Sequence, residues 1–251
     1  MQNPFLTGIL ALAFVCVHLF VGNLKGLATT PRSRWLSFAG GVAVAYVFMH
    51  MLPTLASHGG TFARTTALDE TLAESTVYTL TLIGLVLFYG TERAVIISRG
   101  TQERQHRKRP SSGVFWLHVA SSSLLIFVIA YLLNHREDAS LWGLAIYAAA
   151  MLLHFTTADF GSRSHHPELY DRAGRWTLAG ATVLGWLTGL VIELPMLAIG
   201  GLYAFVAGGI ILTVLKEELP AERESRFAPF LLGAVLYGAL VLGEEALVTA
   251  H

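Results

Sequence analysis

Two histidines stand inside long apolar segments on either side of one short polar connection. His118 lies within residues 113–134 and His154 within residues 140–161, and residues 134–138 read Asn-His-Arg-Glu-Asp. A polar side chain inside a membrane helix is costly and commonly marks an ion or substrate pathway. Neutral imidazole is a good ligand for zinc and other late first-row divalent ions. These two histidines are therefore the first candidates for metal ligands.

The two histidines are expected at the same depth in neighbouring helices. The short connection favours antiparallel packing of the two segments. His118 lies about five residues from the start of its segment, and His154 lies at a similar distance from the end of its own; these are the ends away from the short connection. Both histidines are therefore on the order of 8–10 Å inside the membrane surface. Ser122 is one helical turn from His118 on the same face. Asp159, and His50 in the segment 35–56, are secondary candidates for metal ligands.

This candidate ligand set is small. A tight zinc site has three or four protein ligands, so two histidines with hydroxyls and water predict a weak site. Weak binding is compatible with passage through a transporter. The alternative, that the two rings are hydrogen-bonded structural residues, stays open.

The segments that carry these residues belong to a very apolar chain. Of 251 residues, 54% are hydrophobic and only 14% are charged, and the mean hydropathy is +0.57, whereas a soluble domain is about a quarter charged. Eight apolar runs are long enough to cross about 30 Å of hydrocarbon, and they are too long for the strands of a barrel. The sequence predicts an all-α polytopic membrane protein, a single integral membrane domain over residues 1–251, with spans near residues 4–22, 35–56, 76–98, 113–134, 140–161, 175–193, 195–215 and 227–247.

Charge and cysteine content exclude several classes of function. The net charge is zero, so no bulk electrostatic attraction to nucleic acid is expected. The single cysteine, Cys16, excludes an internal disulfide and a multi-cysteine metal site. A hydrolase is not expected either, because the chain contains neither Gly-x-Ser-x-Gly nor His-Glu-x-x-His.

The basic residues predict the orientation of the eight spans. The first, third, fifth and seventh connections hold all of the 17 lysines and arginines except Arg64, Arg93 and Arg136. By the positive-inside rule these odd-numbered connections are cytoplasmic, and both termini lie outside. We therefore expect a multi-pass protein of the cell (inner) membrane.

At its histidine-bearing segments the chain resembles the ZIP (Zrt/Irt-like) family of divalent-metal transporters. Residues 38–42 read Phe-Ala-Gly-Gly-Val and residues 50–53 read His-Met-Leu-Pro, similar to the family's glycine-rich helix that ends in His-x-x-Pro. His118 aligns with the first residue of the span-four motif His-Asn-x-x-Asp, and His154 with that of the span-five motif His-Glu-x-Pro-His/Glu. Span seven runs from Ala-Gly-Gly at 207–209 to Glu-Glu-Leu-Pro at 217–220.

The resemblance implies a ZIP-like bundle that transports Zn²⁺ or another divalent cation through a site between spans four and five, by alternating exposure. His118 and His154 would be ligands, with Ser122, Asp159 and His50 as secondary ones. No prosthetic group is implied. The expected partners are the lipid bilayer and the metal ion, and a homodimer stays open.

The chain also departs from the family's ligand pattern. The family's Asn and Asp in span four are replaced by Val119 and Ser122, and its Glu, Pro and second His or Glu in span five are replaced by Phe155, Thr157 and Ala158. A second hypothesis is therefore a transport-inactive scaffold or regulator that keeps the bundle and has lost the metal site.

Overall fold

The computed structural model describes residues 3–23, 34–66, 68–104, 112–136, 140–218 and 226–249, and every regular element in these ranges is a helix. The longer helices are α1 (Pro4–Phe20), α4 (Glu70–Arg104), α5 (Ser112–Leu132), α6 (Leu141–His165), α8 (Arg175–Val191), α9 (Met196–Glu218) and α10 (Phe227–Thr249). A continuous helical rod is formed by α2 (Arg34–Tyr46), the π-helical η3 (Val47–Met51) and α3 (Leu52–Thr65). Short elements complete the ends: η1 (Val21–Asn23), α7 (Pro167–Leu169) and the π-helical η4 (Tyr170–Gly174).

Each of the eight predicted spans coincides with one of these rods. Six of the rods are long and apolar enough to cross a membrane within the described residues. The other two are α8, with 17 residues, and α10, whose apolar part Phe227–Gly243 falls below the same length. The all-helical class is thus confirmed for the described residues, and their six to eight long apolar helices are compatible with a polytopic membrane bundle.

The helix that carries His50 changes its hydrogen-bonding pattern just before Pro53. Proline lacks an N–H group, and a bend or stop is expected there. The structure accommodates Pro53 with the π-helical turn of η3, after which the helix continues to Thr65. His50, Thr54 and His58, which are spaced by four residues and so share a helix face, line one cavity.

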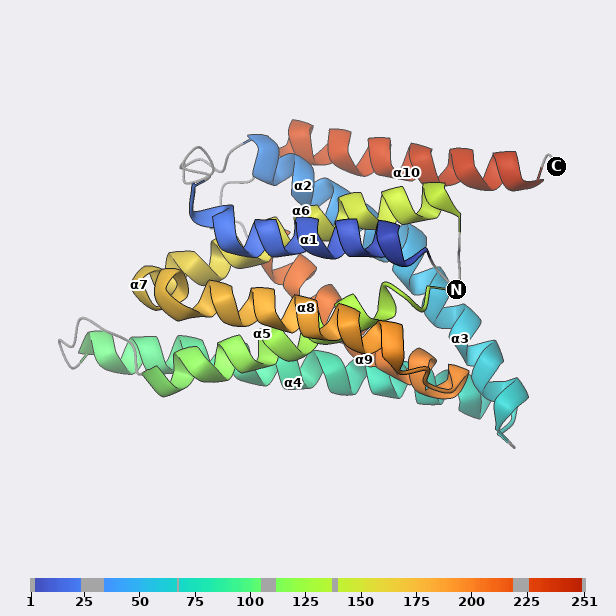
Figure 1. The fold of residues 1–251 in the computed structure, drawn as a ribbon, viewed down its shortest axis with the longest axis horizontal. Helices are drawn as coiled ribbons and strands as arrows, with labels where there is room; N and C mark the ends of the chain where they lie inside the picture. Colours follow the sequence, from blue (N-terminus) through green and yellow to red (C-terminus); the bar gives the residue numbers. More distant parts are fainter. Residues whose placement is uncertain are drawn as a thin grey trace.

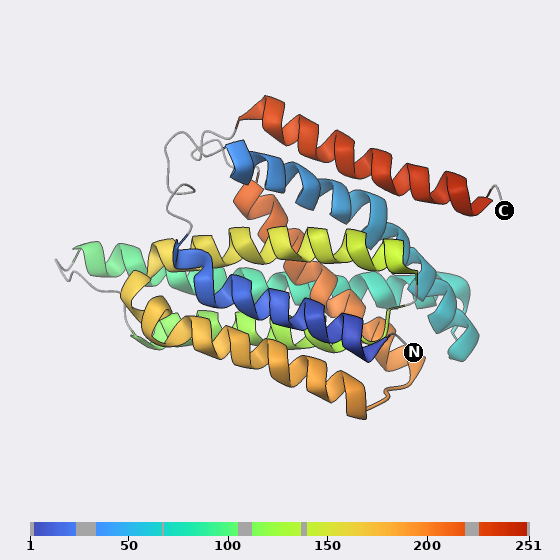
Figure 2. The same cartoon turned by 45° about the horizontal axis from the view of Figure 1, so that its top comes forward.

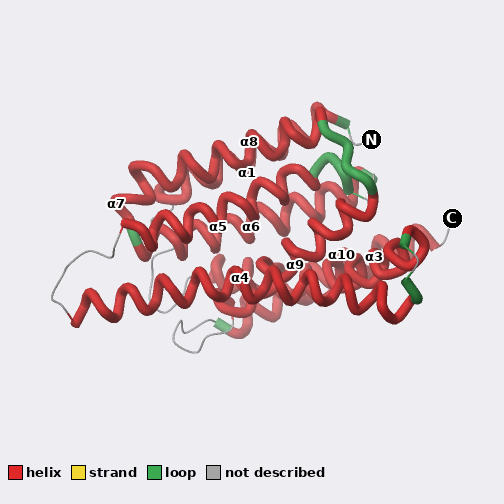
Figure 3. The backbone as a smooth tube through the Cα atoms, turned by 90° about the horizontal axis from the view of Figure 1, so that it is seen from below, coloured by secondary structure: helices red, strands yellow, loops and turns green. Residues whose placement is uncertain are grey.

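The helices pack into two groups. One group is α1, α5, α6 and α8, and the other is the α2–α3 rod with α4, α9 and α10. Figure 3 shows α8, α1, α5 and α6 on one side and α4, α9, α10 and α3 on the other. Within this arrangement α9 crosses the other helices obliquely (Figures 1 and 2). Because of this crossing, α9 also reaches α5 and α6, and the cavities described below lie at that junction.

Glycines set the closest helix pairs. A Cβ atom on Gly84 of α4 would overlap the carbonyl oxygen of Phe205 on α9, and one on Gly208 of α9 would overlap that of Thr81 on α4. Small residues allow such backbone contact inside a bilayer, where apolar side chains alone give no preference for protein over lipid. The same kind of contact joins α2 to α10 and α5 to α8.

The outer surface of the bundle is apolar. Exposed large side chains on α4, α8 and α10 include Leu82, Leu87, Leu184, Leu232 and Val235. Apolar patches of this extent are rare on soluble monomers and suit contact with lipid. Figure 1 shows the start of α1 and the end of α10 at the same end of the bundle, with α7 at the opposite end. That placement agrees with an even number of crossings.

Candidate functional site

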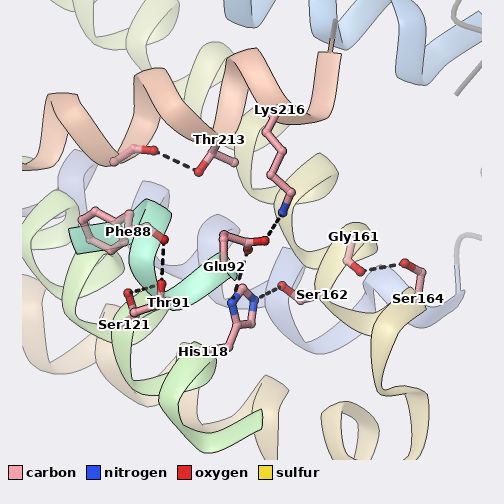
Figure 4. Close-up of polar contacts among 11 residues, drawn as sticks. Phe88, Thr91, Glu92, His118, Ser121, Gly161, Ser162, Ser164, Thr213 and Lys216 are labelled. Carbon is pink, nitrogen blue, oxygen red and sulfur yellow. Dashed lines mark hydrogen bonds and ion pairs between the residues drawn. The ribbon is translucent and has the colours of Figure 1, made fainter. Parts of the chain in front are cut away.

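His118 lies in a polar cluster built by three helices. Its Nε2 atom is 3.0 Å from Oγ of Ser162 on α6, and its Nδ1 atom is 3.5 Å from Oε1 of Glu92 on α4. Figure 4 shows the ring pointing at both partners. A neutral imidazole satisfies both contacts when Nδ1 carries the proton and the Ser162 hydroxyl donates to Nε2. Rotation of that hydroxyl would free the Nε2 lone pair for a cation.

Glu92 joins this cluster to α9. Its Oε2 atom binds Nζ of Lys216, and the two side chains are 17% and 31% exposed. A partly buried carboxylate needs a compensating charge, and Lys216 supplies it. Figure 4 shows Lys216 reaching from α9 toward Glu92, with His118 on the other side of the carboxylate.

His118 and His154 line one cavity of about 70 Å³, which we call the His118 cavity. Ser122 and Asp159 line it too, so four of the five candidate residues come together, beside Glu92 and Lys216. The volume has room for several water molecules. His154 is 3% exposed, and its ring lies 5.8 Å from that of Phe155. The helices around the cavity are α4, α5, α6 and α9.

The expectation that α5 and α6 pack as direct neighbours is wrong. The main partner of α5 is α8, and α6 packs chiefly against α2 and α1. Space therefore remains between α5 and α6, and α9 and α4 close it. The two histidines share a cavity because that space is hollow, although their helices make few close backbone contacts.

Asp159 has a second role at the wall of the His118 cavity. Its Oδ2 atom is 2.6 Å from Nδ1 of His18 on α1, and both residues are buried. Tyr170 donates a hydrogen bond of 3.3 Å to the carbonyl oxygen of His18. A buried carboxylate held by an imidazole is less available to a cation than an open one.

His50 is separated from the other candidates. It lines a different cavity of about 160 Å³, which we call the Arg136 cavity, together with Tyr46, His58, His135, Arg136 and Tyr147. The His50 ring stacks on Tyr46 with 5.5 Å between the ring centroids. The structure therefore does not bring His50 to the ligand set around His118.

The two cavities lie in series along the same three helices. On α5, Ile126 lines the His118 cavity and Ile129 lines the Arg136 cavity; on α6 the corresponding residues are His154 and Met151. On α9, Leu212, Thr213 and Lys216 line the His118 cavity, and Ile210 lines the Arg136 cavity. Two or three residues of helix correspond to about 3–5 Å along the axis. A thin, mostly apolar layer separates one hollow from the next.

The described residues contain no group of three or more His, Cys, Asp or Glu side chains arranged to hold a metal ion. Glu92 and His118 are an adjacent pair of such groups, and His154 also lines the cavity. A cation that used all three would need a rearrangement of Lys216.

Several residues of the site were not predicted. Glu92, Ser162 and Lys216 were missed, and His18 was not assigned to Asp159. The available signal was the presence of ionisable residues inside apolar segments, because such groups seek partners within the bundle. Glu92 satisfies that criterion within the predicted span 76–98, whereas Lys216 adjoins the end of the predicted span 195–215.

Comparison of the chain with models of protein families, with curated proteins and with solved structures gave no match. Its function must therefore be inferred from the chain's own residues.

Proposed function

We propose that the protein is a ZIP-like transporter that carries a divalent cation, zinc or a similar ion, across the membrane. The serial arrangement of two hollows along α5, α6 and α9 is the observation that supports transport most directly. Hollows in series with a thin layer between them suit alternating exposure, because a small change in helix packing could open one hollow and close the other.

The chemistry of the His118 cavity supports a cation as the substrate. Two imidazoles and a carboxylate are a ligand set that zinc accepts, and water can fill the fourth position. Oε1 of Glu92 lies 3.5 Å from Nδ1 of His118, so an ion shared by these two atoms would displace the Nδ1 proton, whereas an ion bound at Nε2 would leave this contact intact. Lys216 holds the carboxylate when no cation is bound, and an arriving ion would replace it. A site of this kind binds weakly enough to release its ion.

The first test is uptake by cells starved of zinc. The double variant His118→Ala with His154→Ala is expected to lose uptake down to the background of cells without the protein, since both nitrogen ligands are gone. Purified wild-type protein is expected to bind zinc saturably, and the double variant is not. Zinc uptake and isothermal titration measure these two effects.

The control variant is Leu117→Ala. Leu117 adjoins His118 on α5, is 46% exposed and lines neither cavity, so uptake should match the wild type. Unchanged uptake in the double histidine variant, with both proteins present in the membrane in equal amounts, would remove the proposal.

A transport-inactive scaffold or regulator is the second candidate. It is favoured by the two carboxylates of the cavity, because Glu92 is bound to Lys216 and Asp159 is held by His18. Reconstituted vesicles separate the candidates: zinc flux into vesicles that contain the purified protein supports the transporter, and flux equal to that of empty vesicles supports the scaffold.

A further inference from the structure

A groove on the outer surface of the bundle lies where α2 and α10 begin. The starts of these two helices lie side by side (Figures 1 and 2), and the backbone N–H of Arg226 donates a hydrogen bond of 3.1 Å to Oγ of Ser37. The groove, which we call the Arg34 groove, is lined by Arg34, Trp35, Phe38, Arg226, Ala228, Pro229 and Leu232. Its volume of about 960 Å³ is in the range of sites for organic ligands, about 300–1,000 Å³, and exceeds what a single ion needs.

The lining of the Arg34 groove changes from charged to apolar along the two helices. Arg34 begins α2, and Arg226 directly precedes α10. Trp35 is 76% exposed, and an exposed tryptophan at the end of an apolar helix is typical of the boundary between membrane and water. Phe38 and Leu232 lie one turn or more further along their helices. The groove therefore extends from the level of the lipid headgroups into the hydrocarbon region.

The positive charge at this end of the bundle does not depend on the partner of any single arginine. Residues 24–34 and 219–226, which lead into α2 and α10, hold five lysines and arginines and two glutamates. Their net charge is +3, so positive charge remains after every glutamate has paired with a basic residue. It stays positive when Lys216, Glu217 and Glu218 at the end of α9 are included. The positive-inside rule predicts that this end is cytoplasmic, and the cytoplasmic leaflet holds anionic lipids.

We propose that the Arg34 groove binds one anionic phospholipid of the cytoplasmic leaflet, with its phosphate held by Arg34 and Arg226 and its acyl chains along Phe38 and Leu232. Guanidinium groups form charge-assisted, often bidentate hydrogen bonds with phosphate. A soluble phosphate would use only the charged part of the groove, whereas a phospholipid fits both parts. The groove shares no lining residue with the His118 cavity or the Arg136 cavity, and the proposal stands whether or not zinc is transported.

Native mass spectrometry of the purified full-length protein in a neutral detergent measures the binding. The protein is titrated with phosphatidylglycerol and, separately, with phosphatidylcholine that carries the same acyl chains. One phosphatidylglycerol should bind at least about ten-fold more tightly than phosphatidylcholine, since each basic residue near an anionic lipid surface contributes about a five-fold gain in affinity. Inorganic phosphate at the same concentration should not displace the lipid, because it lacks acyl chains.

Arginine variants locate the lipid site. Arg34→Gln and Arg226→Gln should each weaken phosphatidylglycerol binding by about five-fold, and both residues are exposed, so these variants are expected to fold. Arg64→Gln is the matched control, because Arg64 is exposed near the far end of the same α2–α3 rod and outside the groove; binding should be unchanged. The variant His118→Ala with His154→Ala should retain phosphatidylglycerol binding, which separates this site from the cation site.

Equal affinity of the wild-type protein for phosphatidylglycerol and phosphatidylcholine would overturn the proposal. Displacement of the lipid by inorganic phosphate at the same concentration would also overturn it, because the groove would then be a site for soluble phosphate. The same holds if the double variant Arg34→Gln with Arg226→Gln binds phosphatidylglycerol as the wild type does, or if Arg64→Gln weakens binding equally. If the double variant does not fold, the comparison of the two lipids on the wild-type protein decides alone.

Discussion

Glu92 has a different partner at each of its two oxygens. Oε2 binds Lys216 of α9, and Oε1 lies 3.5 Å from Nδ1 of His118 of α5. An ammonium group and a divalent cation cannot both take the same carboxylate at full strength. In the proposed transporter Lys216 therefore competes with the substrate and helps to release it.

Lys216→Gln is expected to tighten zinc binding. A unit charge about 4 Å from a bound ion changes its binding free energy by roughly 1–4 kcal/mol, depending on the local dielectric. We therefore expect the dissociation constant for zinc to fall about ten-fold when the Lys216 charge is removed. Isothermal titration of the purified protein measures it. Arg93→Gln is the matched control, since Arg93 is exposed and adjoins Glu92 in the chain. Equal changes in both variants would mean that net charge alone, rather than competition at Glu92, governs binding.

At the residue scale the sequence was informative about part of the site. The depth argument placed His118 and His154 near each other, and the helical repeat added Ser122; all three line one cavity. Glu92 and Lys216 were not predicted as site residues, because charged residues near the end of an apolar run usually reach water. Their pairing depends on α4 and α9 lying side by side, which no local pattern encodes.

At the scale of elements, glycine contacts decide which helices become partners. A Cβ on Gly185 of α8 would overlap the carbonyl oxygen of Phe127, which fixes α8 against α5. This contact explains why α6, despite its short connection to α5, is not the main partner of α5. A short connection constrains only the ends of two helices, whereas backbone contact acts along their length.

Gly208→Ala is expected to destabilise the bundle. The new methyl group would overlap the carbonyl oxygen of Thr81, and overpacking of this kind typically costs about 1–3 kcal/mol. The midpoint of thermal unfolding in detergent should therefore fall. Gly180→Ala is the control, because a Cβ there meets no atom of the described residues within 4 Å.

The control variant should match or slightly exceed the wild type in stability, since alanine favours a helix over glycine by up to about 1 kcal/mol. A Gly208→Ala protein as stable as the wild type would show that α4 and α9 can separate without cost.

The positions of the helices themselves were readable from the sequence. Apolar runs of about 20 residues located all eight rods, because each rod must satisfy its own backbone groups in lipid. The differences lie at the ends: α4 extends over Glu70–Arg104, well beyond the predicted 76–98, and the α2–α3 rod continues past Pro53 to Thr65. Polar helical turns outside the hydrocarbon region carry no hydropathy signal, so their extent could not be inferred.

At the scale of the whole molecule, charge and shape agree on an even number of crossings. The start of α1 and the end of α10 lie at one end of the bundle (Figure 1), and the basic connections are predicted to lie at the other. The eight-span orientation stays a prediction, because α8 and the apolar part of α10 are short for a full crossing.

A reporter fused after His251 is expected to lie outside the cytoplasm. A reporter inserted within residues 105–111 is expected to lie in the cytoplasm, because the positive-inside rule places the third connection there. Activity of paired alkaline phosphatase and fluorescent reporters in intact cells measures this. A cytoplasmic signal from the fusion after His251 would show that the predicted topology is wrong.

The glycine contacts also limit how this molecule can change shape. Where a carbonyl oxygen of one helix lies against the bare Cα of another, as at Gly84 and Gly208, the two rods cannot slip past each other without collision. The pairs α2–α10, α4–α9 and α5–α8 are therefore expected to move as units. The junction of α9 with α5 and α6 is filled by side chains and hollow space instead. Conformational change should therefore concentrate at the interface of α9 with α5 and α6, where both cavities lie.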